Sequence, residues 1–144
     1  ELSKKSTFKD SFKDCESMIQ TVINTLRSCG KGWGNAVFDD TKPNNFTVMP
    51  CLEVHTLYEA PAGEGDNKSF PIFHHWLAID VWQKKIATTL KQREKMKKDV
   101  VLTLLQMEAV VVIEKVREIP DEQHFRDVIE FYCIGGKEDD WRRN

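Results

Sequence analysis

The sequence contains no segment that is able to cross a bilayer as a helix. Its longest apolar run, Val100 to Ile113, is too short for a membrane span and is interrupted by Thr103, Gln106 and Glu108. It also contains no internal repeat, no low-complexity segment and no linker that would divide it. Because its 144 residues lie within the size range of one domain, we expect a single domain over residues 1–144.

A strong charge of one sign is also absent. The formal net charge is -2, from 21 basic and 23 acidic residues, whereas a dedicated nucleic-acid-binding domain usually carries a basic excess. Nucleic acid is therefore not an expected partner. No signal peptide is visible, and we expect a location in the cytoplasm or nucleus. The chain starts at Glu1, so we expect it to be part of a larger protein, with a frayed charged tail from Lys137 to Asn144.

Recognisable catalytic motifs are missing too. The four cysteines are Cys15, Cys29, Cys51 and Cys133, and none lies in a C-x-x-C pair typical of zinc ribbons or thioredoxin-type chemistry. Most of them lie in apolar runs and are expected to be buried free thiols. Cys29 follows a predicted helix, where the helix dipole disfavours a reactive thiolate. There is no G-x-S-x-G turn either, so we expect no catalytic residue and no cofactor.

The first recognisable element is an amphipathic helix. Its apolar side chains recur at spacings of three and four residues, at Phe8, Phe12, Cys15, Ile19, Val22 and Leu26. Thr7 and Asp10 are placed to cap its start, and Gly30 is placed to supply the left-handed residue that ends it. A short strand is expected at Asn35 to Phe38.

A hairpin is predicted next. Phe46, Val48, Leu52 and Val54 alternate with polar residues, which predicts a half-buried strand, and Pro50 suggests that it is an edge strand or contains a bulge. Glu59 to Ser69 is rich in turn-forming residues and predicts an exposed loop. Phe70 to Lys84 predicts the return strand. One of its faces carries Phe73, His75, Leu77, Ile79 and Val81, and the other carries Ile72, His74, Trp76, Ala78, Asp80 and Trp82.

The segment Lys84 to Ile119 joins a basic run to the longest apolar run of the chain. We expect a helix from Thr88 to Met107, and we expect the apolar run to lie in the hydrophobic core. The end of the helix is ambiguous because the residues from Ala109 to Ile113 are mostly β-branched. Either the helix ends by Ala109 and a strand spans Val110 to Ile119, or the helix continues through Val116.

A final strand is predicted from Val128 to Ile134. The order of elements is then helix, strands, long helix and strands. This order predicts an α+β fold, in which an antiparallel sheet carries the N-terminal helix and the long central helix on one face.

Five segments together resemble part of the HORMA fold, especially its autophagy-initiation type. They are the helix from Phe8 to Leu26, the strand opening Cys51-Leu52-Glu53-Val54, the return strand with Trp76-Leu77, the long helix to about Met107, and Val128-Ile129-Glu130-Phe131-Tyr132. The resemblance implies a non-catalytic adaptor that recruits partners through helix and strand surfaces. It assigns no functional residue of this chain.

The leading functional hypothesis is a non-enzymatic protein-interaction domain, an adaptor or scaffold subunit. If the face of the return strand that carries Leu77 packs on the helices, Trp76, Trp82 and His74 lie on the opposite face. Exposed tryptophans often mark partner surfaces. We therefore expect a protein or peptide to bind at a sheet edge or at this aromatic face.

A second hypothesis is an anion-binding module for RNA or an acidic lipid. Lys91, Lys95 and Lys98 lie near one face of the predicted central helix, and Arg93 flanks them. Cations near a helix N-terminus oppose the helix dipole, which hints at an acidic partner. The simpler explanation is a solvated helix face, and the run carries no interleaved aromatic residues for stacking on bases.

A third hypothesis is a metalloenzyme with a site around His55, His75 and Asp80. His55 is able to meet a histidine of the return strand across the hairpin, and Glu53 or Asp80 is able to join it. His74 and His75 are neighbours on a strand and point to opposite faces, so they cannot chelate one ion together. Because nothing in the spacing demands a metal, we expect ordinary satisfied histidines and no metal site.

Overall fold

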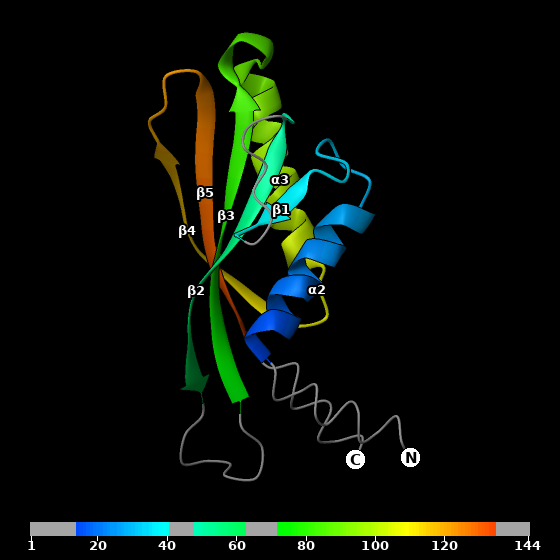
Figure 1. Cartoon of the computed structure of the whole chain (residues 1–144), viewed down its shortest axis with the longest axis vertical. Coiled ribbons are helices and arrows are strands. Elements are labelled where there is room, and N and C mark those ends of the chain that lie inside the picture. Colours follow the sequence, from blue (N-terminus) through cyan, green and yellow to red (C-terminus); the bar gives the residue numbers. More distant parts are fainter. Residues whose placement is uncertain (1–13, 41–47, 63–71, 135–144) are drawn as a thin grey trace.

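A computed structural model describes residues 14–40, 48–62 and 72–134, which form an α+β fold as predicted. Among these residues, five strands form one sheet in the order β1-β2-β3-β5-β4, and two α-helices lie on one side of it (Figure 1). The elements are α2 (Asp14–Ser28), β1 (Val37–Asp39), β2 (Cys51–Ala62), β3 (Ile72–Lys84), α3 (Leu90–Leu105), β4 (Val110–Ile119) and β5 (His124–Ile134). The β1–β2 pair is parallel and the other pairs are antiparallel.

Helix α2 corresponds to the predicted N-terminal helix. Met18, Val22, Ile23 and Leu26 are buried and form the stripe that packs on the sheet. The helix ends before Gly30, whose φ of 71° is the left-handed conformation expected at a helix stop. The predicted start, including the caps at residues 7 and 10, lies outside the described residues, as does the tail from 137 to 144.

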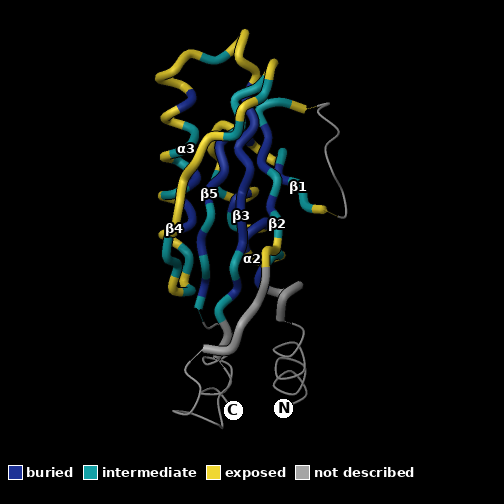
Figure 2. The backbone as a smooth tube through the Cα atoms, turned by 90° about the vertical axis from the view of Figure 1, so that its left-hand side faces the viewer, coloured by how far each residue is buried: buried dark blue, intermediate teal, exposed yellow. Residues whose placement is uncertain are grey.

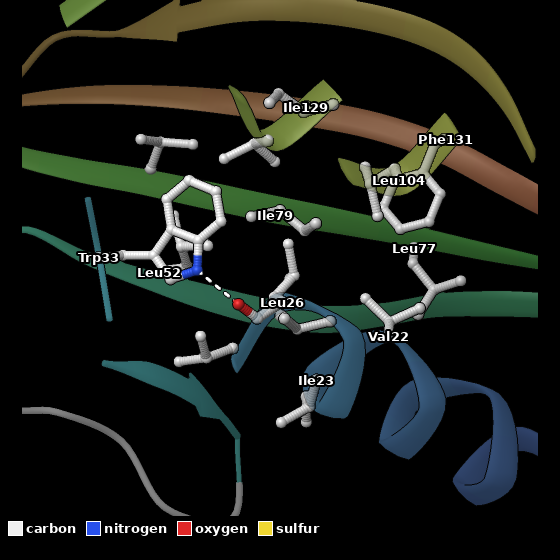
Figure 3. Close-up of a cluster of buried hydrophobic side chains, with 14 of the residues drawn as sticks. Val22, Ile23, Leu26, Trp33, Leu52, Leu77, Ile79, Leu104, Ile129 and Phe131 are labelled. Carbon is white, nitrogen blue, oxygen red and sulfur yellow. Dashed lines mark hydrogen bonds between the residues drawn. The ribbon is translucent and has the colours of Figure 1, made fainter. Parts of the chain in front are cut away.

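The loop after α2 is fastened to the core by Trp33. Its side chain is buried, and its indole Nε1–H donates a 2.8 Å hydrogen bond to the backbone oxygen of Leu26 (Figure 3). The same close-up shows Trp33 and Leu26 beside Leu52 and Ile79 of the sheet. The loop therefore closes one end of the core and satisfies a carbonyl near the end of α2.

The hairpin of β2 and β3 differs from the prediction in where β2 begins and how far it extends. Strand β2 begins at Cys51, after Pro50, and Val48 lies outside it with 45% of its surface exposed. Proline has no N–H for the ladder, which accounts for the position of Pro50 just before the first paired residue, Cys51. Strand β2 also extends through Ala62 into the predicted loop, whose remainder up to residue 71 lies outside the described residues.

Helix α3 spans most of the basic run and the start of the apolar run, and four residues separate its end from β4. Its N-cap is Thr89, which forms a capping box with Gln92. It ends at Leu105, and β4 starts at Val110, which confirms the first of the two alternatives. No described helix is long and apolar enough to span a membrane.

The apolar run was expected to be buried, and this is only partly correct. Val100 and Leu104 have no exposed surface, but Leu102, Leu105 and Val110 are 46%, 51% and 58% exposed. Leu102 and Leu105 belong to α3, on a part of the helix that does not face the core. Val110 is exposed because β4 lies at the edge of the sheet, where it pairs with β5 alone among the described strands. Figure 2 shows exposed residues along much of β4, whereas the neighbouring β5 has buried and intermediate residues and the central β3 is mainly buried.

The core lies between the two helices and one face of the sheet. Alternate residues of the strands point into it, as predicted for β3, where Leu77, Ile79 and Val81 are buried. Strand β5 adds Ile129 and Phe131 to the same face. The residues between them point to the opposite face, which neither described helix covers and which carries the candidate sites (Figure 1).

Candidate functional site

A polar cluster lies on the face of the sheet opposite the helices. Strand β2 contributes Glu53 and His55, β3 contributes Asp80 and Trp82, and β5 contributes Arg126. The strand register brings them together, because Glu53 pairs with Asp80 and Trp82 pairs with Arg126. Cross-strand partners share one face of a sheet, so five side chains from three strands meet there.

Asp40 joins this cluster from the end of β1. In the parallel register of β1 and β2, Asp39 is aligned with Val54, so Asp40 follows next to His55. Asp40 Oδ1 lies 2.7 Å from His55 Nδ1, within hydrogen-bonding distance. An acceptor on Nδ1 favours the proton there and turns Nε2 toward the opposite side.

The second ring nitrogen of His55, Nε2, faces the carboxylate of Asp80. His55 Nε2 lies 3.7 Å from Asp80 Oδ2, and Asp80 is buried. Arg126 donates to the same oxygen from Nε at 2.9 Å and from its terminal nitrogen at 2.7 Å. Trp82 Nε1–H donates to Glu53 Oε1 at 2.9 Å. One oxygen of each carboxylate is thus engaged by a neighbouring donor.

The electrostatics of the cluster favour positive charge on the imidazole. The carboxylates of Asp80 and Asp40 raise the pKa of His55 to about 9. Burial opposes ionisation of Asp80, but its contacts with His55 and Arg126 outweigh this effect and hold its pKa below the ordinary value. At neutral pH the cluster therefore holds a protonated histidine between carboxylates.

Part of the predicted histidine site is assembled. His55 and Asp80 meet, and Glu53 joins them, with one potential ligand atom from each residue within 4.8 Å of the others. His75 does not take part, because it is buried on the core-facing side of β3, one position from His74. The sequence did not predict the contact of Asp40 with His55, since only the pairing of β1 with β2 brings the two residues together.

The predicted aromatic face divides into two parts. Trp82 is only 5% exposed, so the expectation that its side chain is exposed on this face is wrong. Its indole is held by Glu53, the Arg126 guanidinium lies 5.0 Å from its ring centroid, and His124 meets its edge at 5.8 Å. The alternation of β3 points the Trp82 ring away from the core, but side chains of β2 and β5 cover it there.

Trp76 and His74 form a second group, at the other end of β3. Both are half-buried and lie against Tyr132 of β5, with centroid distances of 4.5 Å for Trp76 and 5.0 Å for His74. The register places Val112 of β4 beside Tyr132. We call Trp76, His74, Tyr132 and Val112 the aromatic patch. The sequence alone did not place Tyr132 here, because strand pairing decides it.

The basic residues of α3 do not form one continuous surface. Arg93 is buried and donates two hydrogen bonds to Asp127 of β5, at 2.9 and 2.7 Å. Arg93 therefore holds α3 on the sheet and does not join the exposed basic face. Lys95 pairs with Asp99 at 2.9 Å, whereas Lys91 and Lys98 are exposed. Anion binding stays a prediction for the three lysines.

The comparisons with known proteins do not assign the chain to a family. No protein-family model matches it, and no curated protein matches it. The observations that bear on function are therefore the polar cluster, the aromatic patch and the edge of the sheet.

Proposed function

We propose that this chain is a non-enzymatic protein-interaction domain that binds an extended segment of a partner protein along the edge strand β4. The observation that supports the proposal best is the outer edge of β4, which pairs with no other described strand. An unpaired strand edge offers a row of backbone donors and acceptors to an incoming strand. The adjacent aromatic patch would then supply side-chain contacts.

The chemistry of the edge changes along its length. The first four residues, Val110–Ile113, are apolar and β-branched, and Val110 is 58% exposed. The second half carries Glu114, Lys115, Arg117 and Glu118. Charged residues protect an edge strand against unspecific pairing, so the apolar half is the part suited to a partner.

The aromatic patch continues the apolar half onto the sheet face. Trp76, Tyr132 and Val112 follow one another across β3, β5 and β4, and His74, Ile134 and Val110 form the next row. The described members are partly exposed. A strand added beside β4 would extend both rows and place its alternate side chains next to Val110 and Val112.

A second copy of this chain is a poorer occupant than a different protein. Antiparallel pairing of two β4 strands about their midpoint would match Val110 with Ile119 and Ile113 with Val116. It would, however, place Val111 opposite Glu118 and Val112 opposite Arg117. A partner strand with apolar residues opposite Val110–Ile113 avoids this mismatch. The resemblance of the element order to the HORMA fold, which implies a non-catalytic adaptor, agrees with a separate partner.

Two matched substitutions in one strand test this proposal. Val110→Lys places a charge in the apolar half of β4, and Val116→Lys places the same charge in the other half at a site of 44% exposure. We expect Val110→Lys and Trp76→Ala to abolish capture of proteins that co-purify with the wild-type chain, whereas Val116→Lys retains them. Trp82 is unsuitable as a probe because it is buried and its removal would disturb the polar cluster.

Hydrogen exchange on the purified complex locates the contact. Strand addition predicts slower exchange of β4 backbone amides in the complex than in the free chain. Retention of all partners by Val110→Lys, or unchanged exchange in β4, would reject the proposal. A doubled mass of the free chain that Val110→Lys reduces would identify a second copy as the occupant instead.

A further inference from the structure

We propose that Glu53, His55 and Asp80 form a binding site for a divalent transition-metal ion, with zinc the best match. The three residues offer one imidazole nitrogen and two carboxylates, and their potential ligand atoms lie within 4.8 Å of one another. Imidazole and carboxylate are both ordinary zinc ligands, and a set of three leaves one position for water or another ligand. This site is separate from the β4 edge and the aromatic patch.

The orientation of His55 supports the proposal. Asp40 lies 2.7 Å from Nδ1 on one side of the ring, and Nε2 faces Asp80 at 3.7 Å on the other. A carboxylate bound to the remote nitrogen of a metal-ligating histidine fixes its tautomer and raises its basicity. Asp40 would have this outer role, and the ring would present its Nε2 lone pair to the ion.

The two carboxylates are also held in place by neighbours. Arg126 holds Oδ2 of Asp80, and Trp82 holds Oε1 of Glu53, so each residue keeps a second oxygen for an ion. Bonds of about 2.0 Å to a tetrahedral zinc ion place ligand atoms about 3.3 Å apart. The widest of the present spacings, up to 4.8 Å, must contract by about 1.5 Å, and Glu53 and His55 are only partly buried, which allows this movement.

The charge of the cluster favours a divalent cation. Asp40, Glu53 and Asp80 contribute three negative charges and Arg126 contributes one positive charge, so the cluster with neutral His55 has a charge of two negative units. A divalent ion would neutralise it. The site also contains nitrogen, which distinguishes it from the all-oxygen sites that magnesium and calcium prefer.

Zinc chloride titrations of the purified chain test the site. A proton and a metal ion compete for Nε2 of His55, so the titration is best run at mildly alkaline pH. We expect one zinc ion per wild-type chain, and affinity at least about tenfold lower in His55→Gln and Glu53→Gln. His74→Gln is the matched control, because its histidine lies in the aromatic patch, and it should bind as the wild type does.

Asp40→Asn tests the outer carboxylate without removing a ligand. Its zinc affinity should fall by roughly tenfold, a value typical for the loss of such an outer partner. Magnesium chloride should not displace zinc from the wild-type chain. Nitrogen NMR of the wild-type imidazoles supplies a readout that needs no variant: zinc should shift Nε2 of His55 and leave His74 unchanged.

Three results would each overturn the proposal. Absence of zinc binding to the wild-type chain, equal affinity in His55→Gln and the wild type, or an unshifted His55 Nε2 at saturating zinc would each remove the site. Because the NMR measurement uses the wild-type chain, a variant that fails to fold does not decide the question.

Discussion

At the scale of single residues, burial decides which side chains are able to contact a partner or react with a reagent. Trp82 and Trp76 lie on the same face of β3, yet Trp82 is enclosed by Glu53 and Arg126 whereas Trp76 is partly exposed. Cys133 illustrates the same rule for a thiol. It has no exposed surface, and burial raises its pKa to about 12.

We predict that Cys133 is unreactive in the folded chain. A thiol with a pKa near 12 is almost entirely protonated at neutral pH, and only the thiolate is a good nucleophile. The number of thiols that iodoacetamide labels under native conditions should be unchanged in Cys133→Ala. It should fall in Cys29→Ala, because Cys29 is partly exposed. Rapid native labelling of Cys133 would contradict the prediction.

The same thiol predicts how stability depends on pH. The pKa of Cys133 is raised on folding from about 9 to about 12, so the folded state favours the protonated form. The contribution to stability is complete below pH 9 and is lost as the pH rises toward 12. The melting temperature of the wild type should therefore fall more steeply than that of Cys133→Ala over this interval, and parallel curves would be the contrary result.

At the scale of elements, the helices and strands follow local patterns, but specific contacts fix their positions. Helix α3 has a capping box at Thr89 and buries few apolar residues, with Val100 and Leu104 the most buried. Its first half is held by Arg93, which is paired with Asp127 of β5 and stacked on Phe125 at 4.3 Å. This buried ion pair fastens the start of α3 to the sheet.

We predict that Arg93→Ala lowers the free energy of unfolding by about 3–5 kcal/mol, because it leaves the buried carboxylate of Asp127 without its main partner. The double variant Arg93→Met with Asp127→Leu should recover most of the loss, since it removes both charges. Urea denaturation measures both. Lys95→Ala is the control: its side chain is 71% exposed, and the loss should stay below about 1 kcal/mol. A similar small loss in Arg93→Ala would show that the ion pair does not hold the helix.

At the scale of the whole molecule, the sheet is most stable at its centre. Strand β3 is paired with β2 and β5, and both described helices cover the face that bears Ile79. Strand β4 is paired on one side and carries several exposed residues. Its position explains why the β4 part of the apolar run lies at the margin of the core, whereas Val100 and Leu104 of α3 lie within the core.

This arrangement predicts a gradient of hydrogen-exchange protection. Backbone amides in the β3–β5 pair should exchange most slowly, near the rate of global unfolding, and those of β1 and β4 should exchange faster. Amide exchange followed by NMR in the free chain measures the gradient. If β4 were as protected as β3 in the free chain, another segment would cover its edge, and the proposed strand addition would lose its support.

Local periodicity in the sequence determined much of the fold. The apolar spacing around Val22 and Leu26 predicted α2, Gly30 predicted its end, and the alternation from Leu77 to Val81 predicted the core face of β3. These patterns depend on neighbours a few residues away, so the sequence carries them directly.

Tertiary structure alone decided which distant residues meet. It brought Asp40 to His55 through the parallel pairing of β1 and β2, enclosed Trp82, and placed β4 at the edge of the sheet. No local pattern specifies these results, because strand order and register depend on the packing of all elements at once. The two proposed sites therefore follow from the pairing of strands that are far apart in the chain.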